Sequence, residues 1–231
     1  MTEAILVLGL HRSGTSCLTG CLRDYGLHLG AVSGFNKYNQ QGNQEDRQIF
    51  KLNEALLNHN NASWNAPPNQ VIQWNHELEL RRDQVLNKYH TLPKPWGIKD
   101  PRLLLTYPFW QYHLPPHEMV ATFRHPKAVA QSLATRKNLS VPMKKGYELW
   151  KIYNLQLIEL YEKNNILIIN FDLPGEKYLS KVEKLADAIN LNCKHKDTFF
   201  DPELKNQGEF ARKDCPPELL DTYDRLLEIV A

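Results

Sequence analysis

The sequence lacks a strong excess of charge of either sign. Its 231 residues include 28 lysines and arginines against 26 aspartates and glutamates, which gives a formal net charge of +2 at pH 7. A long-range field that would draw the chain onto a nucleic acid or an anionic membrane is therefore excluded. Any site for an anion has to be built locally, from a few cations and backbone N–H groups.

The sequence also lacks an apolar run of the roughly 20 residues that a membrane-spanning helix needs. No cationic segment with a cleavage site follows the opening Met-Thr-Glu, so we expect no signal peptide. Hydrophobic residues make up 42% of the chain and charged residues 23%, as is typical of a globular protein. Because no repeat, low-complexity tract or linker divides the chain, we expect one domain over residues 1–231, in the cytoplasm.

Cysteine is scarce, and its four occurrences show no CxxC pair and no histidine at the spacing of a zinc site. Cys17 and Cys21 lie four residues apart, on one face of a predicted helix. Small buried packing residues are the favoured interpretation there, over a redox or metal role. Cys193 and Cys215 add no further pattern. We expect a reducing compartment and no metal ion.

Short apolar runs alternate along the chain with amphipathic segments of helical period. Strands are predicted at residues 5–8, 96–98, 119–123 and 166–171. Helices are predicted at 15–25, 44–58, 76–89, 145–163, 177–189 and 217–230, with others starting near Pro101 and just after the third strand. Because helical crossovers join successive strands, the fold class is α/β: a central, mainly parallel sheet flanked by helices in three layers, like that of the P-loop nucleotide hydrolases. Ligands of such sheets gather at the carboxyl ends of the strands.

The first strand end carries a glycine loop, residues 9–16, with the G-x-x-x-x-G spacing of a nucleotide-binding loop. It lacks the lysine that kinases and NTPases place directly after the second glycine, and Thr15 stands there instead. The cation of this loop is Arg12, which stands two residues before the second glycine. Backbone N–H groups, the helix dipole and the hydroxyls of Ser13, Thr15 and Ser16 suit one phosphate. The same groups do not suit a triphosphate with Mg²⁺, because the lysine for its terminal phosphates is missing.

Cations also follow the other strands. Arg124 ends the third strand, and Ser132 lies eight residues later, about two turns into the next helix. A planar guanidinium binds phosphate through two hydrogen bonds, and a hydroxyl adds a donor.

The second strand ends in Lys99-Asp100-Pro101-Arg102, where Asp100 is placed to cap a helix starting at Pro101. Two alternatives stay open for Arg102: pairing with Asp100, or reaching a substrate.

These motifs, in this order, resemble those of the sulfotransferases that use 3′-phosphoadenosine 5′-phosphosulfate (PAPS). The bacterial carbohydrate or small-molecule branch and the tyrosylprotein branch are the most similar in motif style. The resemblance implies the sulfotransferase fold, PAPS as co-substrate and adenosine 3′,5′-bisphosphate (PAP) as product. It implies that Lys99 and Arg12 flank the transferring sulfuryl group and that Arg124 and Ser132 clamp the 3′-phosphate. The 5′-phosphosulfate would be bound by Arg12, Ser13, Gly14, Thr15 and Ser16.

The acceptor hydroxyl needs a general base, and members of the family use glutamate or histidine. Glu45 is the nearest equivalent of the glutamate in the tyrosylprotein branch, although it lies further from the glycine loop than that glutamate does. The alternative for Glu45 is a place in the first turn of a helix, where the dipole favours it. His11, inside the loop, is the second candidate for the base and His28 is the third.

Two other segments are compared with the family, and a third is the predicted substrate-facing region. Residues 171–173, Phe-Asp-Leu, resemble the residues that end a late strand in the family, and that strand end usually has a structural role. Residues 212–214, Arg-Lys-Asp, are an incomplete match to the Arg-Lys-Gly segment that closes on the 3′-phosphate in cytosolic sulfotransferases, because the glycine is missing. Residues 34–74 contain Trp64 and Trp74, which either stack on a substrate or belong to the core.

We therefore expect transfer of a sulfuryl group to a hydroxyl of a carbohydrate, glycolipid or small molecule, with no nucleic-acid partner. A peptide tyrosine stays open as acceptor, and the sequence does not define the oligomeric state. Two other functions stay open. One is a P-loop ATP-dependent kinase or NTPase, which the missing lysine argues against. The other is a non-catalytic nucleotide-binding module of the same fold.

Overall fold

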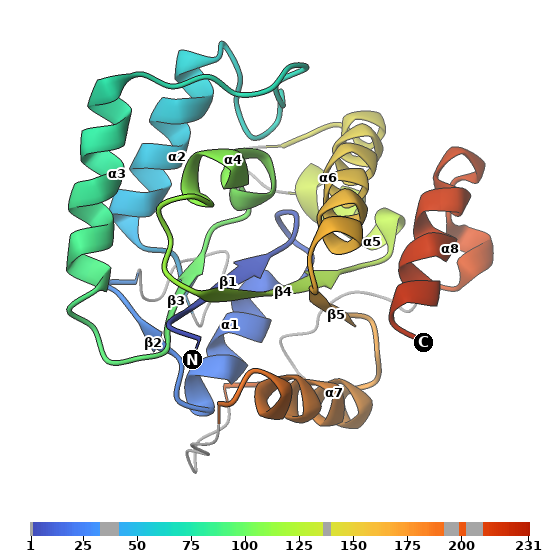
Figure 1. The fold of residues 1–231 in the computed structure, drawn as a ribbon. Coiled ribbons are helices and arrows are strands. Elements are labelled where there is room, and N and C mark those ends of the chain that lie inside the picture. Colours follow the sequence, from blue (N-terminus) through green and yellow to red (C-terminus); the bar gives the residue numbers. More distant parts are fainter. Residues whose placement is uncertain (1, 33–41, 136–139, 192–198, 202–209) are drawn as a thin grey trace.

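A computed structural model describes residues 2–32, 42–135, 140–191, 199–201 and 210–231. Five parallel strands form one sheet, in the order β2-β3-β1-β4-β5 (Figure 1). Their bounds are β1 Ala4–Leu8, β2 His28–Leu29, β3 Trp96–Lys99, β4 His117–Phe123 and β5 Leu167–Asn170. The parallel sheet and the four predicted strands are confirmed. The prediction missed β2, because two residues are too few to give a hydrophobic pattern.

Helices connect the strands, as predicted. They are α1 Thr15–Asp24, α2 Arg47–His59, α3 His76–Tyr89, α4 Leu103–Trp110, α5 Pro126–Ala134, α6 Met143–Lys163, α7 Gly175–Ala188 and α8 Leu220–Ile229. Short 3₁₀ turns, Arg212–Asp214 and Pro217–Leu219, come before α8. None of these helices is both long enough and apolar enough to cross a membrane.

Among the helix starts that differ from the prediction, those of α2 and α4 lie beside the predicted motifs. Helix α2 begins at Arg47 because the carboxylate of Asp46 accepts hydrogen bonds from the backbone N–H groups of Gln48 (2.6 Å) and Ile49 (3.3 Å). Glu45 therefore lies before the helix and not in its first turn. Helix α4 begins at Leu103. Asp100 Oδ1 accepts a hydrogen bond from the backbone N–H of Arg102 (2.8 Å), which forms a turn before the helix.

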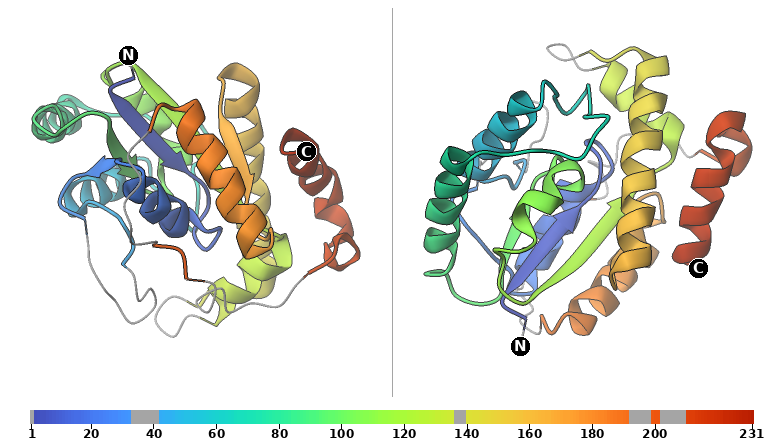
Figure 2. Two further views of the ribbon diagram at one scale, coloured as in Figure 1. Left: turned by 90° about the horizontal axis from the view of Figure 1, so that it is seen from below. Right: turned by 45° about the horizontal axis from the view of Figure 1, so that its top comes forward.

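Strand β1 divides the core between the two faces of the sheet. Leu6 and Leu8 point into a cluster built with α2, α3, α4 and α6, which cover one face. Ile5 and Val7 point the other way, into a smaller cluster with α1 and α7. This alternation follows from the period of two along a strand. Seen from below, α1 and α7 lie in front of the strands, so that the molecule has three layers (Figure 2).

The carboxyl ends of the four longer strands lie together at one edge of the sheet. Val7 of β1 is in register with Lys99, the last residue of β3, and Leu8 is in register with Ala121 of β4. Phe123, the last residue of β4, is in register with Asn170, the last residue of β5. The segments that follow these strands contain the three predicted motifs and Asp172.

Candidate active site

The glycine loop turns directly from β1 into α1. Gly9 has φ of 143° and Gly14 has φ of 92°, and a Cβ atom at Gly9 would lie 2.5 Å from the carbonyl oxygen of Thr122. Glycine is thus required where the loop approaches β4. Because α1 begins at Thr15, the N–H groups of its first turn have no partner within the helix and face the loop. N–H groups at the start of a helix are suited to bind an anion, so the predicted role of the loop stays a prediction that this geometry allows.

The hydroxyls of the loop are not equivalent. Ser13 is buried, and both its N–H group (3.2 Å) and its hydroxyl donate to the carbonyl oxygen of Leu10. The Thr122 hydroxyl in turn donates to the carbonyl of Ser13 (3.1 Å). Thr15 is also buried, with its methyl group directed toward Gly9. Ser13 and Thr15 therefore shape the loop, whereas Ser16 directs its hydroxyl toward Lys99.

The ammonium group of Lys99 lies where three parts of the site meet. Its Nζ donates to Glu45 Oε1 at 2.6 Å, to the carbonyl oxygen of Asn43 at 3.0 Å and to Ser16 Oγ at 3.2 Å. Three acceptors match the three protons of an ammonium group. The Lys99 side chain is only 2% exposed and that of Glu45 14%, so this ion pair is shielded from water.

Glu45 reaches this position although it is distant from the loop in sequence. The Ser16 hydroxyl donates to the carbonyl oxygen of Asn43 (3.0 Å), which holds the segment before α2 against the start of α1. The predicted base, the predicted cation and the phosphate loop are thereby joined in one cluster of hydrogen bonds. Glu45 therefore contacts Lys99 and does not lie in the first turn of a helix, which was the alternative for this residue.

Arg12 connects the first motif to the second. Its Nε donates to Ser132 Oγ at 2.7 Å, across 120 residues of sequence. Arg12 has φ of 72°, a backbone conformation that is uncommon for a residue other than glycine. Ser132 is buried in α5. The structure therefore brings Arg12, predicted to bind the 5′-phosphosulfate, into direct contact with Ser132, predicted to bind the 3′-phosphate of the same ribose.

Arg124 is held by a carboxylate that sequence reasoning assigned to a structural element. Its Nε donates to Asp172 Oδ1 at 3.0 Å, and the backbone N–H of His125 donates to Asp172 Oδ2 at 2.6 Å. The guanidinium also lies over the ring of Phe171, with 5.3 Å from Cζ to the ring centroid. An acidic residue directly after the strand predicted at residues 166–171 was the available signal for this contact.

Asp100 and Arg102 form a network beside Lys99. Arg102 donates from Nη1 to Asp100 Oδ1 (3.0 Å) and from Nε to Glu54 of α2, and its guanidinium stacks on the ring of Phe50 at 4.4 Å. Both Asp100 and Arg102 are buried. Of the two alternatives, Arg102 pairs with Asp100, and the network fixes the turn that carries Lys99 out of β3.

The other candidate bases differ in position. His11 packs against Trp64, with ring centroids 4.4 Å apart. His28 lies in β2 in register with Trp96, the first residue of β3, and thus at the amino edge of the sheet. The carboxyl edge, where Lys99 lies, is the opposite one. Only Glu45 and His11 therefore lie with the motifs.

The tryptophans of the predicted substrate region are part of the core. Trp64 is 7% exposed, and its carbonyl oxygen accepts a hydrogen bond from the Tyr153 hydroxyl (2.9 Å). Trp74 packs edge-on against Phe109, with ring centroids 5.6 Å apart. Of the two alternatives, packing describes both residues. Residues 33–41 of this region lie outside the described residues.

The segment Arg212–Asp214 lies beside the second motif. Phe210 stacks on His125 with ring centroids 5.3 Å apart, and Asp214 lies 3.8 Å from Lys127. Arg212 itself donates from Nε and Nη2 to the two carboxylate oxygens of Asp224 in α8. The segment is therefore close to the predicted 3′-phosphate clamp, with its first cation engaged elsewhere.

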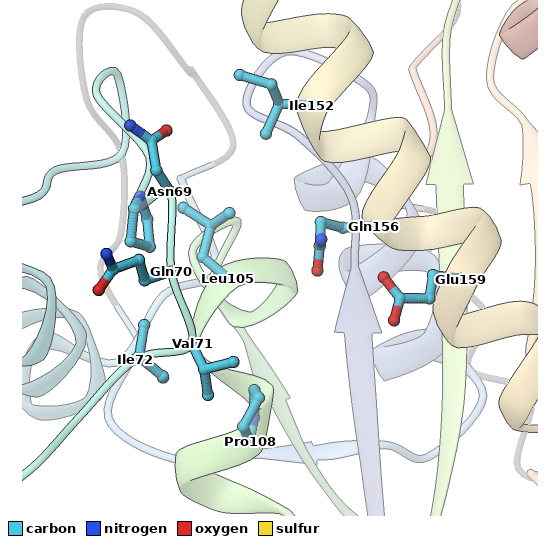
Figure 3. A pocket seen from close by; sticks show the side chains of 10 residues that line it. Asn69, Gln70, Val71, Ile72, Leu105, Pro108, Ile152, Gln156 and Glu159 are labelled. Atoms are coloured by element: carbon cyan, nitrogen blue, oxygen red, sulfur yellow. The ribbon is translucent and has the colours of Figure 1, made fainter.

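A cavity of about 370 Å³ opens in the outer layer, between the segment 68–72, α4 and α6 (Figure 3). Its walls combine apolar side chains with amides and one carboxylate, namely Pro68, Asn69, Gln70, Val71, Ile72, Leu105, Pro108, Ile152, Gln156 and Glu159. None of the predicted site residues lines this cavity. Within the described ranges, no three His, Cys, Asp or Glu side chains are grouped so that they could hold a metal ion.

Comparison with solved structures finds this fold in known enzyme domains. The sulfotransferase domain from the curacin biosynthetic pathway has a TM-score of 0.53 and 16% identity, over 90% of this chain and 79% of that one. The sulfotransferase domain of the Synechococcus PCC 7002 olefin synthase has a TM-score of 0.53 and 13% identity, over 95% and 83%. No protein-family model and no curated protein matches the sequence. At these identities the likeness concerns the fold, and the predicted fold class is confirmed.

Proposed function

We propose that this chain, whose fold is that of the sulfotransferase domains, moves a sulfuryl group from PAPS to an acceptor hydroxyl. The observation that carries the proposal is the contact of Lys99 with both Glu45 (2.6 Å) and Ser16 (3.2 Å). It unites a cation for the leaving group, a base for the acceptor and the loop for the 5′-phosphate. A site that only bound a nucleotide would not need a shielded Lys–Glu pair at the end of the phosphate loop.

The two strand-end motifs bind the two phosphate groups on the ribose of the donor. The N–H groups at the start of α1 and the Arg12 guanidinium hold the 5′-phosphosulfate, and Arg124 with Ser132 holds the 3′-phosphate. The contact between Arg12 and Ser132 supports this assignment, since one nucleotide has to touch both motifs. Thr15, at the position where an NTPase has lysine, argues against a triphosphate ligand.

The chemical half follows the logic of phosphoryl transfer, in which positioning and charge stabilisation supply most of the catalysis. The acceptor oxygen forms a bond to sulfur while the bond from sulfur to the 5′-phosphate oxygen breaks, and that electron pair leaves with PAP. The acceptor proton passes to the carboxylate of Glu45. Lys99 and Arg12 stabilise the negative charge that grows on the leaving oxygen. No change of oxidation state occurs.

For the acceptor, we propose a hydroxyl of a carbohydrate, glycolipid or other small molecule. A net charge of +2 supplies little attraction for a polyanionic glycan or an acidic peptide. The two structural neighbours come from the curacin biosynthetic pathway and from an olefin synthase, which favours a small-molecule acceptor. The buried thiols of Cys21 and Cys215 favour a reducing compartment such as the cytoplasm.

Two experiments test the proposal. In a thermal-shift assay, PAP is expected to raise the melting temperature more than ATP with Mg²⁺ does; the reverse order would favour the kinase or NTPase. With ³⁵S-labelled PAPS and a panel of hydroxyl acceptors, label is expected to reach an acceptor in the wild type and to be lost in Lys99→Ala and Arg12→Ala. Binding of PAP without transfer to any acceptor would favour the non-catalytic module.

A further inference from the structure

We propose that Asp172, at the end of β5, is a positioning residue that sets the guanidinium of Arg124 for the donor's 3′-phosphate. The inference rests on the proposed function, because it concerns the same nucleotide site. Asp172 itself does not touch the donor. It acts through Arg124 and through the backbone on which Arg124 is mounted.

The carboxylate of Asp172 holds the side chain and the main chain of two successive residues at once. One oxygen accepts from Arg124 Nε (3.0 Å) and the other from the backbone N–H of His125 (2.6 Å). A carboxylate can do this because both of its oxygens are acceptors. The direction of the guanidinium is thereby fixed relative to the start of α5, which carries Ser132.

Asp172 is itself anchored. Its backbone N–H donates to Asn170 Oδ1 (2.9 Å), and the N–H of the preceding Phe171 donates to the carbonyl oxygen of Phe123 (2.9 Å), which continues the ladder between β4 and β5. The Asp172 side chain is 24% exposed and that of Arg124 only 7%. A well-anchored carboxylate beside a shielded cation is suited to hold it in one geometry.

Phe171 extends the same support to the phosphate loop. Its ring lies under the Arg124 guanidinium, and it fills the space that a side chain at Gly14 would need, since a Cβ there would be 2.2 Å from Phe171 Cδ2. Consecutive residues at the end of β5 therefore contact the predicted 5′-site and the predicted 3′-site. The late strand does more than complete the sheet.

The negative charge of Asp172 would by itself oppose the binding of a phosphate beside it. A carboxylate next to Arg124 weakens the attraction of that cation for a phosphate, so the Asp172 charge does not help binding as such. Its benefit has to be geometric: a guanidinium held in place loses less conformational entropy when the phosphate binds. Loss of Asp172 would also remove a charged hydrogen bond from a shielded guanidinium, which could then turn toward other acceptors.

The test measures the affinity of the full chain for PAP and for adenosine 5′-phosphate, by isothermal titration calorimetry. The ratio of the two affinities isolates the contribution of the 3′-phosphate, which a general loss of stability would not change selectively. In Asp172→Asn, whose amide can accept from only one of the two donors, the preference for PAP is expected to fall about tenfold, as for one lost charged hydrogen bond. Glu176→Gln, an exposed charge removal on α7, is the matched control and should keep the wild-type ratio.

Should Asp172→Asn fail to fold, Asp172→Glu takes its place, because the longer side chain keeps the charge but displaces both oxygens. It too is expected to lower the ratio. A wild-type ratio in a folded Asp172 variant overturns the inference and leaves the proposed function standing. Equal affinity of the wild type for the two nucleotides overturns the proposed function itself, so the two failures are distinguishable.

Discussion

Arg12 and Ser132, 120 residues apart in the chain, are joined by a hydrogen bond of 2.7 Å from Nε to Oγ. The bond connects the glycine loop after β1 with helix α5 after β4, so it spans the gap between two neighbouring strand ends. Because it engages Nε, it restricts the plane of the whole guanidinium. The cation assigned to the 5′-phosphosulfate is thus oriented by the hydroxyl assigned to the 3′-phosphate.

Ser132→Ala is expected to weaken PAP binding about tenfold, since it removes a hydroxyl donor to the phosphate and releases Arg12. Calorimetric titration with PAP measures this directly. The matched control is Ser140→Ala, which removes an exposed hydroxyl that donates to the carbonyl of Ala134 (2.8 Å). Equal PAP affinity in Ser132→Ala and the control would exclude Ser132 from the donor site.

Glu45→Gln is expected to slow sulfuryl transfer about 10² to 10⁴-fold, the range for loss of a general base. PAP affinity should not fall, because the phosphate of PAP then no longer competes with the Glu45 carboxylate for the Lys99 ammonium. Single-turnover transfer from ³⁵S-labelled PAPS separates the two quantities. Transfer at the wild-type rate would remove Glu45 from the reaction and turn attention to His11, which packs on Trp64 beside the loop.

Lys99→Ala is expected to reduce transfer as well, and the double variant with Glu45→Gln should lose less than the product of the two single losses. The reason is that each residue is the other's ion-pair partner at 2.6 Å, so that removal of one already disturbs the other. A double-mutant cycle on the single-turnover rate measures this coupling. Lys88→Ala serves as control, since Lys88 lies in α3 and contacts Gln48 at the surface.

Much of the fold follows from local patterns in the sequence. The buried strands are short apolar runs, and the meeting of the three motifs at one edge follows from their parallel direction. What the sequence could not supply is the lateral order of the strands. The contacts of Arg12 with Ser132 and of Arg124 with Asp172 depend on which strand lies beside which.

The contact of Glu45 with Lys99 shows a second limit of sequence reasoning. Glu45 belongs to a segment without periodic structure, whose path depends on a hydrogen bond between the Ser16 hydroxyl and the Asn43 carbonyl. No spacing rule predicts such a bond. The late start of α4 has the same origin, since the side chain of Asp100 was expected to cap a helix and instead holds a turn before it.

His125 is expected to make the stability of the protein depend on pH. Burial lowers its pKa below the ordinary value of 6.5, with Asp172, Asp214 and the backbone of Ala211 acting in the opposite direction and Lys127 adding to the lowering. The unfolded chain therefore binds a proton more readily than the folded one. The stabilisation is complete above about pH 6.5 and is lost as the pH falls toward the lower, folded-state value.

Urea unfolding between pH 5 and pH 8 measures this effect, in comparison with His125→Asn. The asparagine keeps an oxygen that can accept from the N–H of Lys127, as His125 Nδ1 does at 3.2 Å. The variant is expected to be less stable at pH 8, because it loses the stacking on Phe210, but its stability should decline less between pH 6.5 and pH 5. An identical decline in both proteins would assign the pH dependence to other groups.

Gly14→Ala is expected to lower the free energy of unfolding by about 2–4 kcal/mol, from the left-handed backbone and from the collision with Phe171 together. The φ of 92° alone disfavours a side chain, and a Cβ there would lie 2.2 Å from Phe171 Cδ2. Gly26→Ala, with φ of 99° after the far end of α1, isolates the backbone cost, and urea unfolding compares the two. If the collision matters, Phe171→Leu in the Gly14→Ala background should recover part of the loss, although it costs stability in the wild type.

A Gly14→Ala loss equal to that of Gly26→Ala, without recovery by Phe171→Leu, would mean that the loop moves away from β5 at little cost. Tight packing between Gly14 and Phe171 would then not fix the phosphate loop.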